Sequence, residues 1–409
     1  MKKYFVMLGG NMLGRGTCDK LHEFGYNVLI IDWNETPAIL GDMHIRLDVK
    51  DSKAIIEKLK ELKLNIAGAL SFIDLAAPTV NAINKWCGNK TMPDKFNHVL
   101  TKEHMQNCWM ANNLFNCISM TDDQFCLDDI YELSQRMKLI CKPNIAASSR
   151  GITICEKGDK KNFIAEAVIK AKDMSYDNKC IIEEYIEGEE FTVDLLGDSY
   201  GNVCCYGSSI QYHSENALNN HVTIKHHWNS RKYSDEIWTR IADFGIKCYK
   251  AIGLNTMFGH LEIIMKKDGT FIPVEMGARS SGFICSHTVS AASGYDYLHD
   301  YVKMLHGEAI VSGHHLNGPT SSMWFGYDFP VGTHSVKESN LEIFLDPRIQ
   351  VIYNKRIGLV AGQVFGPKIN DVDRDKYGYE ILVGPKDVLT IESIEKAEQA
   401  FLDDFLGRT

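Results

Sequence analysis

Hydrophobic and polar positions alternate with two different periods along the first part of the chain. Three short apolar runs have the length and composition of buried strands: 4–8, 28–31 and 66–70. The segments that follow them repeat apolar residues at helical spacing, up to about residue 24, from Ser52 and over 75–86. Strands that alternate with helices predict a parallel sheet with helical crossovers.

The pattern changes from about Lys102 onward, where a helix is expected. Strands and a helix then follow in a mixed order: strand 139–142, strand 152–155, helix 159–171, and strands 180–185, 191–196 and 203–210. This order predicts a small α+β unit followed by a further sheet. Residues 211–234 are polar and rich in histidine, and we expect them to form a long loop.

The pattern regains clear periods after this polar segment. Ser234 is the expected cap of a helix that ends at Gly253. A hairpin over 260–276 and a helix over 295–305 follow it. The C-terminal portion carries short strands, among them 321–325 and 359–365.

The hairpin carries two carboxylates, Glu262 and Glu275. Its strands flank a turn at 267–269, and we expect the returning strand to place Phe271, Pro273 and Glu275 on one face. A surface hairpin with solvated glutamates is one interpretation. Both strands are otherwise apolar, however, and a pair of buried carboxylates commonly binds a metal ion. Arg279, four residues after Glu275, adds a cation that can meet a charged substrate.

Two segments between Lys142 and Glu190 suggest a phosphate and nucleotide site. The loop 146–151, with sequence AASSRG, follows Lys142 directly, and its small residues can donate backbone N–H groups to phosphates. A plain turn is the alternative. The strand–turn–strand 181–196 crowds five glutamates together, which favours cationic or hydrogen-bonding partners for some of them. Its strand edge can bind an adenine ring, and the Glu190 carboxylate can accept hydrogen bonds from ribose hydroxyls.

Composition narrows the class of protein without changing this picture. The chain has 409 residues, 44% hydrophobic and 24% charged, which is typical of a globular protein with several structural units. Its net charge of -9 argues against nucleic acid or anionic membranes as partners. No apolar run has the length of a membrane span, and the N-terminal run leads into a glycine turn instead of a cleavage site.

The cysteine spacing argues against a zinc or disulfide site, and the first glycine turn argues against a dinucleotide site. The 12 cysteines are scattered without a C-x-x-C pair, as expected for reduced core residues of a cytoplasmic protein. The first turn resembles a dinucleotide fingerprint, but Asn11 stands where the second glycine belongs. We therefore do not expect NAD, even though Asp32 ends the second strand.

Taken in order, these pieces resemble the ATP-grasp superfamily. The series is Lys102, then Lys142 with its loop, then E-E-Y-I-x-G-x-E, and finally two glutamates with Arg279. H-x-E at His260 and E-M-G-A-R-S-S-G from Glu275 are most similar to carboxylate–amine ligases of the L-amino-acid ligase type. The resemblance runs from residue 1 to about 300 and more loosely to the C-terminus.

The resemblance implies an α/β fold of ATP-grasp architecture. It implies an N-terminal doubly wound parallel-sheet (pre-ATP-grasp) domain, a small α+β lid and a larger α+β domain with a C-terminal extension. The expected boundaries are 1–97 for the first domain, 98–190 for linker helices and lid, 191–300 for the large subdomain with the metal site, and 301–409 for a C-terminal α+β subdomain.

The resemblance also implies a role for each matching residue. The expected nucleotide-binding residues are Lys102, Lys142, Ser148, Ser149, Glu183, Glu184, Ile186 and Glu190. Glu262 and Glu275 are the expected ligands of Mg²⁺ or Mn²⁺, and Arg279 and Lys142 the expected catalytic residues. Arg150, His260 and Arg279 are expected to contact the substrate. Many relatives carry an asparagine two residues after the second glutamate, where this chain has Gly277.

The implied function is ATP-dependent ligation of a small carboxylate, such as an amino acid, to an amine through an acyl phosphate. Two alternatives remain: a biotin-independent carboxylase of the same fold, and an ATP-binding protein without activity. Which acid and which amine are joined stays open. The candidate residues for selecting them are Arg150, Ser280, Ser281 and the 211–234 segment with His221, His226, His227 and Arg231. A homodimer is the expected assembly on general grounds.

Overall fold

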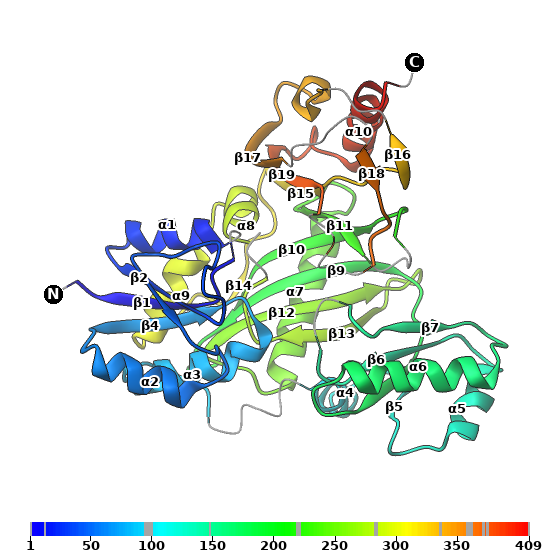
Figure 1. Ribbon diagram of the computed structural model, residues 1–409, viewed down its shortest axis with the longest axis horizontal. Helices are drawn as coiled ribbons and strands as arrows, with labels where there is room; N and C mark the ends of the chain where they lie inside the picture. The colour runs from blue at the N-terminus through cyan, green and yellow to red at the C-terminus, as the bar shows by residue number, and fades with distance from the viewer. Residues whose placement is uncertain are drawn as a thin grey trace.

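A computed structural model describes residues 2–11, 14–93, 101–146, 149–217, 222–281, 285–334, 338–356, 363–369, 373 and 376–407. The chain forms three regions (Figure 1): a parallel sheet at the N-terminus, a small antiparallel sheet, and a long sheet that lies between them. A two-stranded sheet, β16 (Gly332–His334) with β18 (Gln363–Phe365), lies near the C-terminus. No helix among the described residues is long and apolar enough to cross a membrane.

The N-terminal region has the predicted parallel sheet. Its strands follow the order β3-β2-β1-β4: β1 (Tyr4–Leu8), β2 (Asn27–Asp32), β3 (Met43–Arg46) and β4 (Ile66–Ser71). Helices α1 (Arg15–Glu23), α2 (Ser52–Glu61) and α3 (Ala77–Trp86) connect and flank them. Strands β1, β2 and β4 are almost fully buried, which is why they read as continuous apolar runs, whereas the edge strand β3 is half-exposed and was not predicted. The carboxylate of Asp32 accepts the Gly10 N–H at 2.7 Å and so braces the first turn.

The second region is a small antiparallel sheet with one helix packed along it. The strand order is β5-β8-β6-β7, with β5 (Ser119–Thr121), β6 (Leu139–Pro143), β7 (Thr153–Cys155) and β8 (Cys180–Glu184). Helix α6 (Lys161–Met174) buries Ile164, Ala167 and Ala171 against it. Helices α4 (Lys102–Ala111) and α5 (Leu127–Ser134) complete this lid region. The 11 cysteines whose side chains the structure describes are free thiols, and most of them are buried or half-buried, with Cys126 exposed.

The long sheet joins residues from 189 to 385. Its strand order is β13-β12-β9-β10-β11-β15-β19-β17, with β14 beside β10. The strands are β9 (Glu189–Gly197), β10 (Val203–His213), β11 (Thr223–Trp228), β12 (Met257–Met265), β13 (Phe271–Gly277), β14 (Gly313–His314), β15 (Thr320–Gly326), β17 (Gln350–Arg356) and β19 (Gly378–Pro385). The strands of the C-terminal portion thus extend the sheet that carries the glutamate hairpin. The division of the chain at 97, 190 and 300 stays a prediction.

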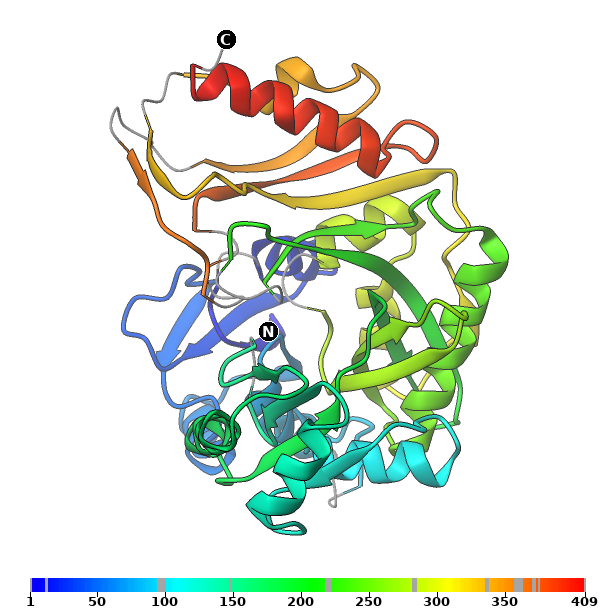
Figure 2. The ribbon, with the colours of Figure 1, turned by 90° about the vertical axis from the view of Figure 1, so that its right-hand side faces the viewer.

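Further helices pack on or beside this sheet. They are α7 (Asp235–Ala251), α8 (Cys285–Ser293), α9 (Tyr297–Leu305) and α10 (Ile391–Phe405), with short 3₁₀ turns η2 (Asp74–Ala76) and η4 (Leu341–Phe344). Helix α7 lies along β9, β10, β12 and β13. Helix α7 begins after Ser234 as predicted, although the Ser234 side chain makes no cap hydrogen bond. Helix α10 lies across the C-terminal strands (Figure 2) and packs Ile394 and Phe401 against Phe325 and Leu382.

The prediction of a long loop over 211–234 is wrong. Strand β10 continues to His213, and β11 is a fully buried strand inside the sheet. Several of its polar side chains have partners in neighbouring segments: Thr223 donates to Gln211 at 2.6 Å, and the Lys225 ammonium lies 2.9 Å from Glu398 on α10. A strand whose polar residues have partners in distant segments has no hydrophobic alternation to detect.

Candidate functional site

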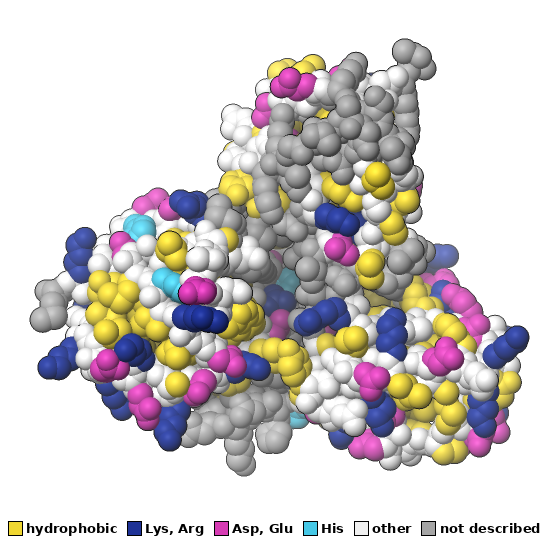
Figure 3. Space-filling model, viewed as in Figure 1, with side chains coloured by type: hydrophobic (Ala, Val, Ile, Leu, Met, Phe, Trp, Pro, Cys, Tyr) yellow, Lys and Arg dark blue, Asp and Glu magenta, His cyan; other side chains and the backbone are white. Residues whose placement is uncertain are grey.

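A cavity of about 470 Å³ lies where the three regions meet. The N-terminal region contributes Trp33, Phe72 and Asp74, the lid contributes Lys142, Arg150 and Tyr176, and the long sheet contributes His260, Glu262, Glu275 and Arg279. Lys102 lines it as well, from the start of α4. Charged side chains of both signs lie in the hollow between the N-terminal region and the lid (Figure 3). The structure therefore brings together predicted residues from segments far apart in sequence.

Glu262 and Glu275 are direct partners across the β12–β13 hairpin. The turn is the predicted one, with Gly269 at φ +81°. Between Pro273 and Glu275 the register shifts, because Ile263 pairs with Pro273 and leaves Val274 as an extra residue. The predicted face of Phe271, Pro273 and Glu275 is therefore wrong: the bulge turns Glu275 to the side of Glu262 and Ile272. A bulge re-aims the side chains that follow it.

Lys102 and Glu275, which both line the cavity, form an ion pair with Nζ 2.6 Å from Oε2. Burial acts to raise the pKa of the Glu275 carboxyl, but the adjacent Lys102 ammonium, with Lys142 and Arg279, offsets this and the pKa is lowered. Burial acts to lower the pKa of Lys102, but Glu275, with Glu262 and Asp74, offsets this and the pKa is raised. Both groups are therefore charged at neutral pH.

Lys142 makes a second buried ion pair, with Glu183. The two residues come from the neighbouring strands β6 and β8, and both side chains are under 10% exposed. The second oxygen of Glu183, Oε1, is buried without a hydrogen-bond partner among the described residues. A buried acceptor that lacks a donor at the wall of a cavity suits a ligand that supplies one.

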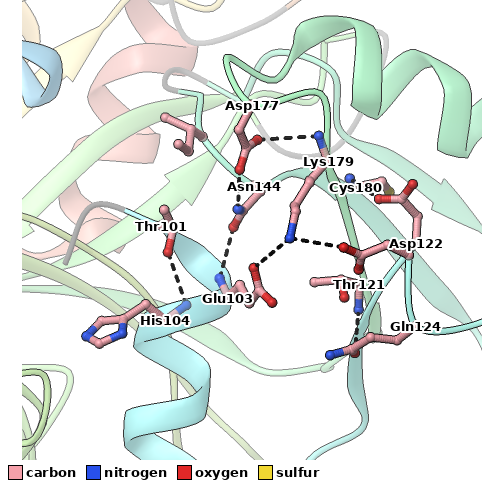
Figure 4. Close-up of polar contacts among 12 residues, drawn as sticks. Thr101, Glu103, His104, Thr121, Asp122, Gln124, Asn144, Asp177, Lys179 and Cys180 are labelled. Atoms are coloured by element: carbon pink, nitrogen blue, oxygen red, sulfur yellow. Dashed lines mark hydrogen bonds and ion pairs between the residues drawn. The ribbon is translucent and has the colours of Figure 1, made fainter. Parts of the chain in front are cut away.

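Asn144, two residues after Lys142, makes hydrogen bonds at the start of helix α4 and within the lid (Figure 4). Its side-chain oxygen accepts the Glu103 N–H at 2.9 Å, and its carbonyl accepts the Lys102 N–H at 3.2 Å. Its amide nitrogen donates to Asp177 at 2.6 Å, and its backbone N–H to the Lys179 carbonyl at 3.1 Å. Asn144 thus caps the start of α4 from the end of β6, which fixes Lys102 relative to Lys142.

One arm of the cavity is an apolar slot beside the end of β8. Its walls are aliphatic and aromatic side chains from the lid and the hairpin: Phe115, Ile140, Ile152, Ile264, Ile272 and Val274. Residues 183–186 form its edge. None of the described residues hydrogen-bonds to the backbone of Ile186, so a planar ring in the slot has a free strand edge beside it.

The remaining residues predicted for nucleotide binding lie around the same slot. Glu184, Glu190 and Ser149 line it, and Glu190 also lies 3.2 Å from the His213 imidazole. Glu189 instead contacts Lys232 and Tyr233. The glutamates of the 181–196 segment therefore have different polar partners. Ser148 lies outside the described residues.

Arg279 is held by groups on two sides. Its Nε donates to Asp74 Oδ2 at 3.0 Å, and its Nη1 donates to the Ser280 carbonyl at 3.1 Å. Burial acts to lower the pKa of the guanidinium, but Asp74 offsets this and the pKa is raised. Arg279 therefore stays charged at the cavity wall, two residues from Ser281, whose hydroxyl is buried without a partner among the described residues.

His260 is fixed by a carboxylate that sequence reasoning did not find. Its Nδ1 lies 2.8 Å from Oδ1 of Asp194, the fully buried residue opposite it on β9. The imidazole lines the cavity beside Glu262. Arg150 lines the cavity from the lid. The predicted substrate residues therefore meet in one place.

The histidine-rich segment divides between the two faces of β11. His226 and Trp228 line the cavity, whereas His227 faces the C-terminal region and contacts Ser321 at 2.8 Å. Arg231 is exposed outside the cavity, and His221 lies outside the described residues. Successive strand residues point to opposite faces, so of the two adjacent histidines only His226 reaches the cavity.

Asp74 and Trp228 are site residues that the sequence pattern did not reveal. A signal for Asp74 exists, because it follows the carboxyl end of the parallel strand β4, where α/β sheets place ligand-binding residues. Trp228 and Asp194 offer no such signal, because a buried strand residue reads as core.

Comparisons with known proteins agree with this arrangement. Residues 135–288 match the family model described as ATP-grasp domain. A D-alanine–D-alanine ligase from Actinobacillus succinogenes is 23% identical over 171 residues, which cover 39% of this chain and 51% of that protein. The chain thus spans about half the length of that relative.

Solved structures match over nearly the whole chain. An L-amino acid ligase from Bacillus licheniformis superposes with a TM-score of 0.75 at 16% identity, covering 98% of both chains. The biotin carboxylase domain of 2-oxoglutarate carboxylase from Hydrogenobacter thermophilus, in complex with MgADP, ADP and bicarbonate, superposes with a TM-score of 0.65 at 15% identity, covering 93% of this chain and 86% of that one. At these identities the likeness is one of fold. Residues 135–288 therefore form an ATP-grasp domain, and the converging lysines and glutamates lie in and around it within a three-part α/β fold.

Proposed function

We propose that this protein is an ATP-dependent carboxylate–amine ligase. The observation that carries the proposal is the convergence of Lys102, Lys142, Glu262, Glu275 and Arg279 on one cavity. This set matches the needs of phosphoryl transfer, which are cations for phosphate oxygens and carboxylates for a metal. The similarity to ligases supports carbon–nitrogen bond formation as the reaction class.

Nucleotide binding is assigned to the apolar slot and the two lysines. The slot suits the adenine ring, with the free backbone of Ile186 as its hydrogen-bonding edge. With adenine in the slot, Glu190 and Glu184 would lie next to the ribose. Lys102 and Lys142 would lie next to the phosphates. Both lysines are neutralised by glutamates in this structure. Phosphates would therefore replace those carboxylates as lysine partners, freeing Glu275 for the metal.

The glutamate pair suits a magnesium or manganese ion. Mg²⁺ is usually bound by one or two carboxylates together with substrate phosphates, and Glu262 and Glu275 offer two carboxylates on one face of the hairpin. When bound, the ion supplies positive charge that polarises the phosphate oxygens. The relative from Hydrogenobacter thermophilus was solved with MgADP, which supports the same pairing of nucleotide and metal.

The reaction then needs no nucleophile from the protein. A carboxylate oxygen of the substrate bonds to the γ-phosphorus as the bond to the β-phosphate oxygen breaks, which yields ADP and an acyl phosphate. The amine nitrogen bonds to the acyl carbon, loses a proton, and phosphate leaves. Lys142 and Lys102 hold the phosphates, and Arg279 stabilises the charge on the transferring phosphoryl group and the acyl oxygen.

The proposed substrates are a small carboxylate, such as an amino acid, and an amine. Arg150 supplies a cation, and His260 a ring held by Asp194, at the part of the cavity beyond the glutamates. His226 and Trp228 extend that wall. Assembly as a homodimer stays a prediction.

The test is a mass-spectrometric screen of the protein with ATP, Mg²⁺ and a mixture of amino acids and small amines. We expect a condensation product together with ADP and phosphate. Glu275→Gln should reduce ADP formation by roughly 100-fold or more. The matched control is Glu189→Gln, whose carboxylate lies outside the cavity, and it should stay within about twofold. Absence of product and phosphate, with no effect of Glu275→Gln, contradicts the proposal.

A carboxylase is the second candidate, because a carboxylase structure with bound bicarbonate has the same fold. The two functions separate in one assay: ADP formation that requires bicarbonate and yields a carboxylated product favours the carboxylase. An inactive nucleotide-binding protein would instead bind ATP in calorimetry without turnover on any substrate.

A further inference from the structure

The carboxylate of Asp74 occupies the space beside Gly277. Asp74 begins the short turn η2 after the N-terminal sheet, and Gly277 ends β13 of the long sheet. A Cβ atom at position 277 would lie 2.5 Å from Asp74 Oδ1, and 3.3 Å from Cγ of Arg279. Non-bonded heavy atoms do not approach to 2.5 Å without displacement. No side chain at position 277 is therefore compatible with this placement of Asp74.

The same carboxylate sets the direction of Arg279. Nε of Arg279 lies 3.0 Å from each Asp74 oxygen, with its hydrogen bond to Oδ2. Nη1 donates to the Ser280 carbonyl, 3.1 Å away. Two of the three guanidinium nitrogens are thus occupied, and the described residues offer no partner to Nη2. The planar guanidinium cannot turn without breaking one of these bonds.

The contact joins regions 205 residues apart in sequence. Asp74 belongs to the N-terminal region, whereas Arg279, Glu275 and Glu262 belong to the long sheet. Both partners of the ion pair line the cavity and are less than one-third exposed. An ion pair with this burial is stronger than a surface pair and depends on its geometry.

We propose that Asp74 is a positioning residue for Arg279 and that position 277 is glycine because the Asp74 carboxylate fills the space of its side chain. The consequence for catalysis rests on the function proposed above, in which Arg279 meets the phosphoryl group. Asp74 then acts through Arg279, by aiming Nη2 at the reacting atoms. The pair Asp74–Gly277 forms a unit, so that a change at either position disturbs the same guanidinium.

The first test needs no substrate. The Nε–H resonance of Arg279 is followed in protein labelled with ¹⁵N-arginine and assigned by its loss in Arg279→Lys. Asp74→Ala should abolish or markedly shift this resonance, and Asp74→Asn, which keeps one acceptor oxygen, should change it less. The matched control is Asp328→Asn, which breaks another buried ion pair, with Lys368 at 2.8 Å, and should leave the resonance in place. An unchanged resonance in Asp74→Ala overturns the proposal.

The second test is a double-mutant cycle on turnover. Asp74→Ala should lower kcat by roughly 100-fold, because a misplaced catalytic group loses about that factor. The Kd of the ATP analogue AMP-PNP with Mg²⁺ should change less than threefold. In an Arg279→Ala background, Asp74→Ala should have almost no further effect on kcat. An equal loss in both backgrounds overturns the proposal, since Asp74 would then act independently of Arg279.

The third test concerns Gly277. Gly277→Ala should disturb the Arg279 resonance in the wild-type background, because its methyl group displaces Asp74. In the Asp74→Ala background the same substitution should change kcat by less than twofold, because the clash with the carboxylate is gone. A Gly277→Ala variant that keeps the wild-type resonance overturns the proposal. If the wild-type protein ligates nothing, the proposed function fails, and the resonance experiments still decide the role of Asp74.

Discussion

Lys102 and Glu275 face each other across the boundary between helix α4 and the hairpin, with Nζ 2.6 Å from Oε2. Each stabilises the charged form of the other. The pair joins the lysine proposed to bind phosphate to the glutamate proposed to bind metal. The resting site is therefore internally neutralised, and binding of nucleotide and metal exchanges partners without leaving a buried charge alone.

Removing Lys102 should be more harmful than removing both partners. Lys102→Met leaves Glu275 uncompensated and is expected to lower stability by about 2 kcal/mol, reduced from a fully buried case because the Glu275 side chain is 31% exposed. The double variant with Glu275→Gln should recover much of that loss. Urea unfolding of the four proteins measures the coupling. Additive losses contradict the interpretation.

The contribution of this pair to stability should depend on pH in a defined direction. The pKa of Glu275 is held below its ordinary value of 4.5, so the contribution is present above that pH and is lost as the pH falls through the lowered value. The pKa of Lys102 is held above 10.5, so the loss at the alkaline end begins above that pH. The difference in urea midpoint between wild type and Glu275→Gln should therefore be constant from pH 6 to 9.

Asn144→Ala should separate the two lysines. The substitution leaves the Glu103 N–H without its acceptor and removes one donor from the Asp177 carboxylate, which keeps Ser175, at an expected loss of about 1–3 kcal/mol. AMP-PNP affinity should fall by roughly tenfold, because Lys102 loses its fixed distance to Lys142. Calorimetric titration measures the affinity. Asn112→Ala, an exposed change on the same helix, serves as control, and an equal effect of both variants would contradict the role of Asn144.

His227 should make the protein less stable in acid. It is fully buried, and burial lowers its pKa from the ordinary 6.5 to about 4. The folded state therefore binds its proton less readily than the unfolded state, and stability is lost as the pH falls from 6.5 to about 4. The loss amounts to about 3 kcal/mol at the acidic limit. His227→Gln, which does not titrate, should flatten the urea midpoint over this range, and an unchanged pH profile would refute the assignment.

The neighbouring His226 should affect substrate use instead. His226→Ala removes a cavity wall and should raise KM for the acid or amine by roughly tenfold while AMP-PNP affinity stays within twofold. His227→Gln provides the comparison on the opposite face of the strand. A change in nucleotide affinity with unchanged substrate KM would place His226 in the wrong part of the site.

Much of the fold follows from local pattern. Strands β1, β2 and β4, helices α3 and α7 and the hairpin turn at Gly269 are expected because burial imposes a period that survives in the sequence. The placement of Glu262 and Glu275 on neighbouring strands follows from the same hairpin, whereas their direct opposition depends on the bulge at Val274. These features need only neighbours along the chain, so reading the chain in order suffices to predict them.

The remaining features arise from contacts between distant segments. Strand β11 was not predicted because its side chains are polar. They are buried because Gln211, Glu398 and Ser321 supply polar partners. The bulge at Val274 depends on how β13 meets β12, and it reverses the faces expected from simple alternation.

By itself, the sequence determined the order of strands and helices and the lysine and glutamate series that points to the ATP-grasp family. Only the tertiary structure decided which histidine faces the cavity, and that Asp74 stands beside Gly277 and holds Arg279. The physical reason is that periodicity records whether a side chain is buried, whereas the partner of a buried charge is chosen by packing between regions hundreds of residues apart.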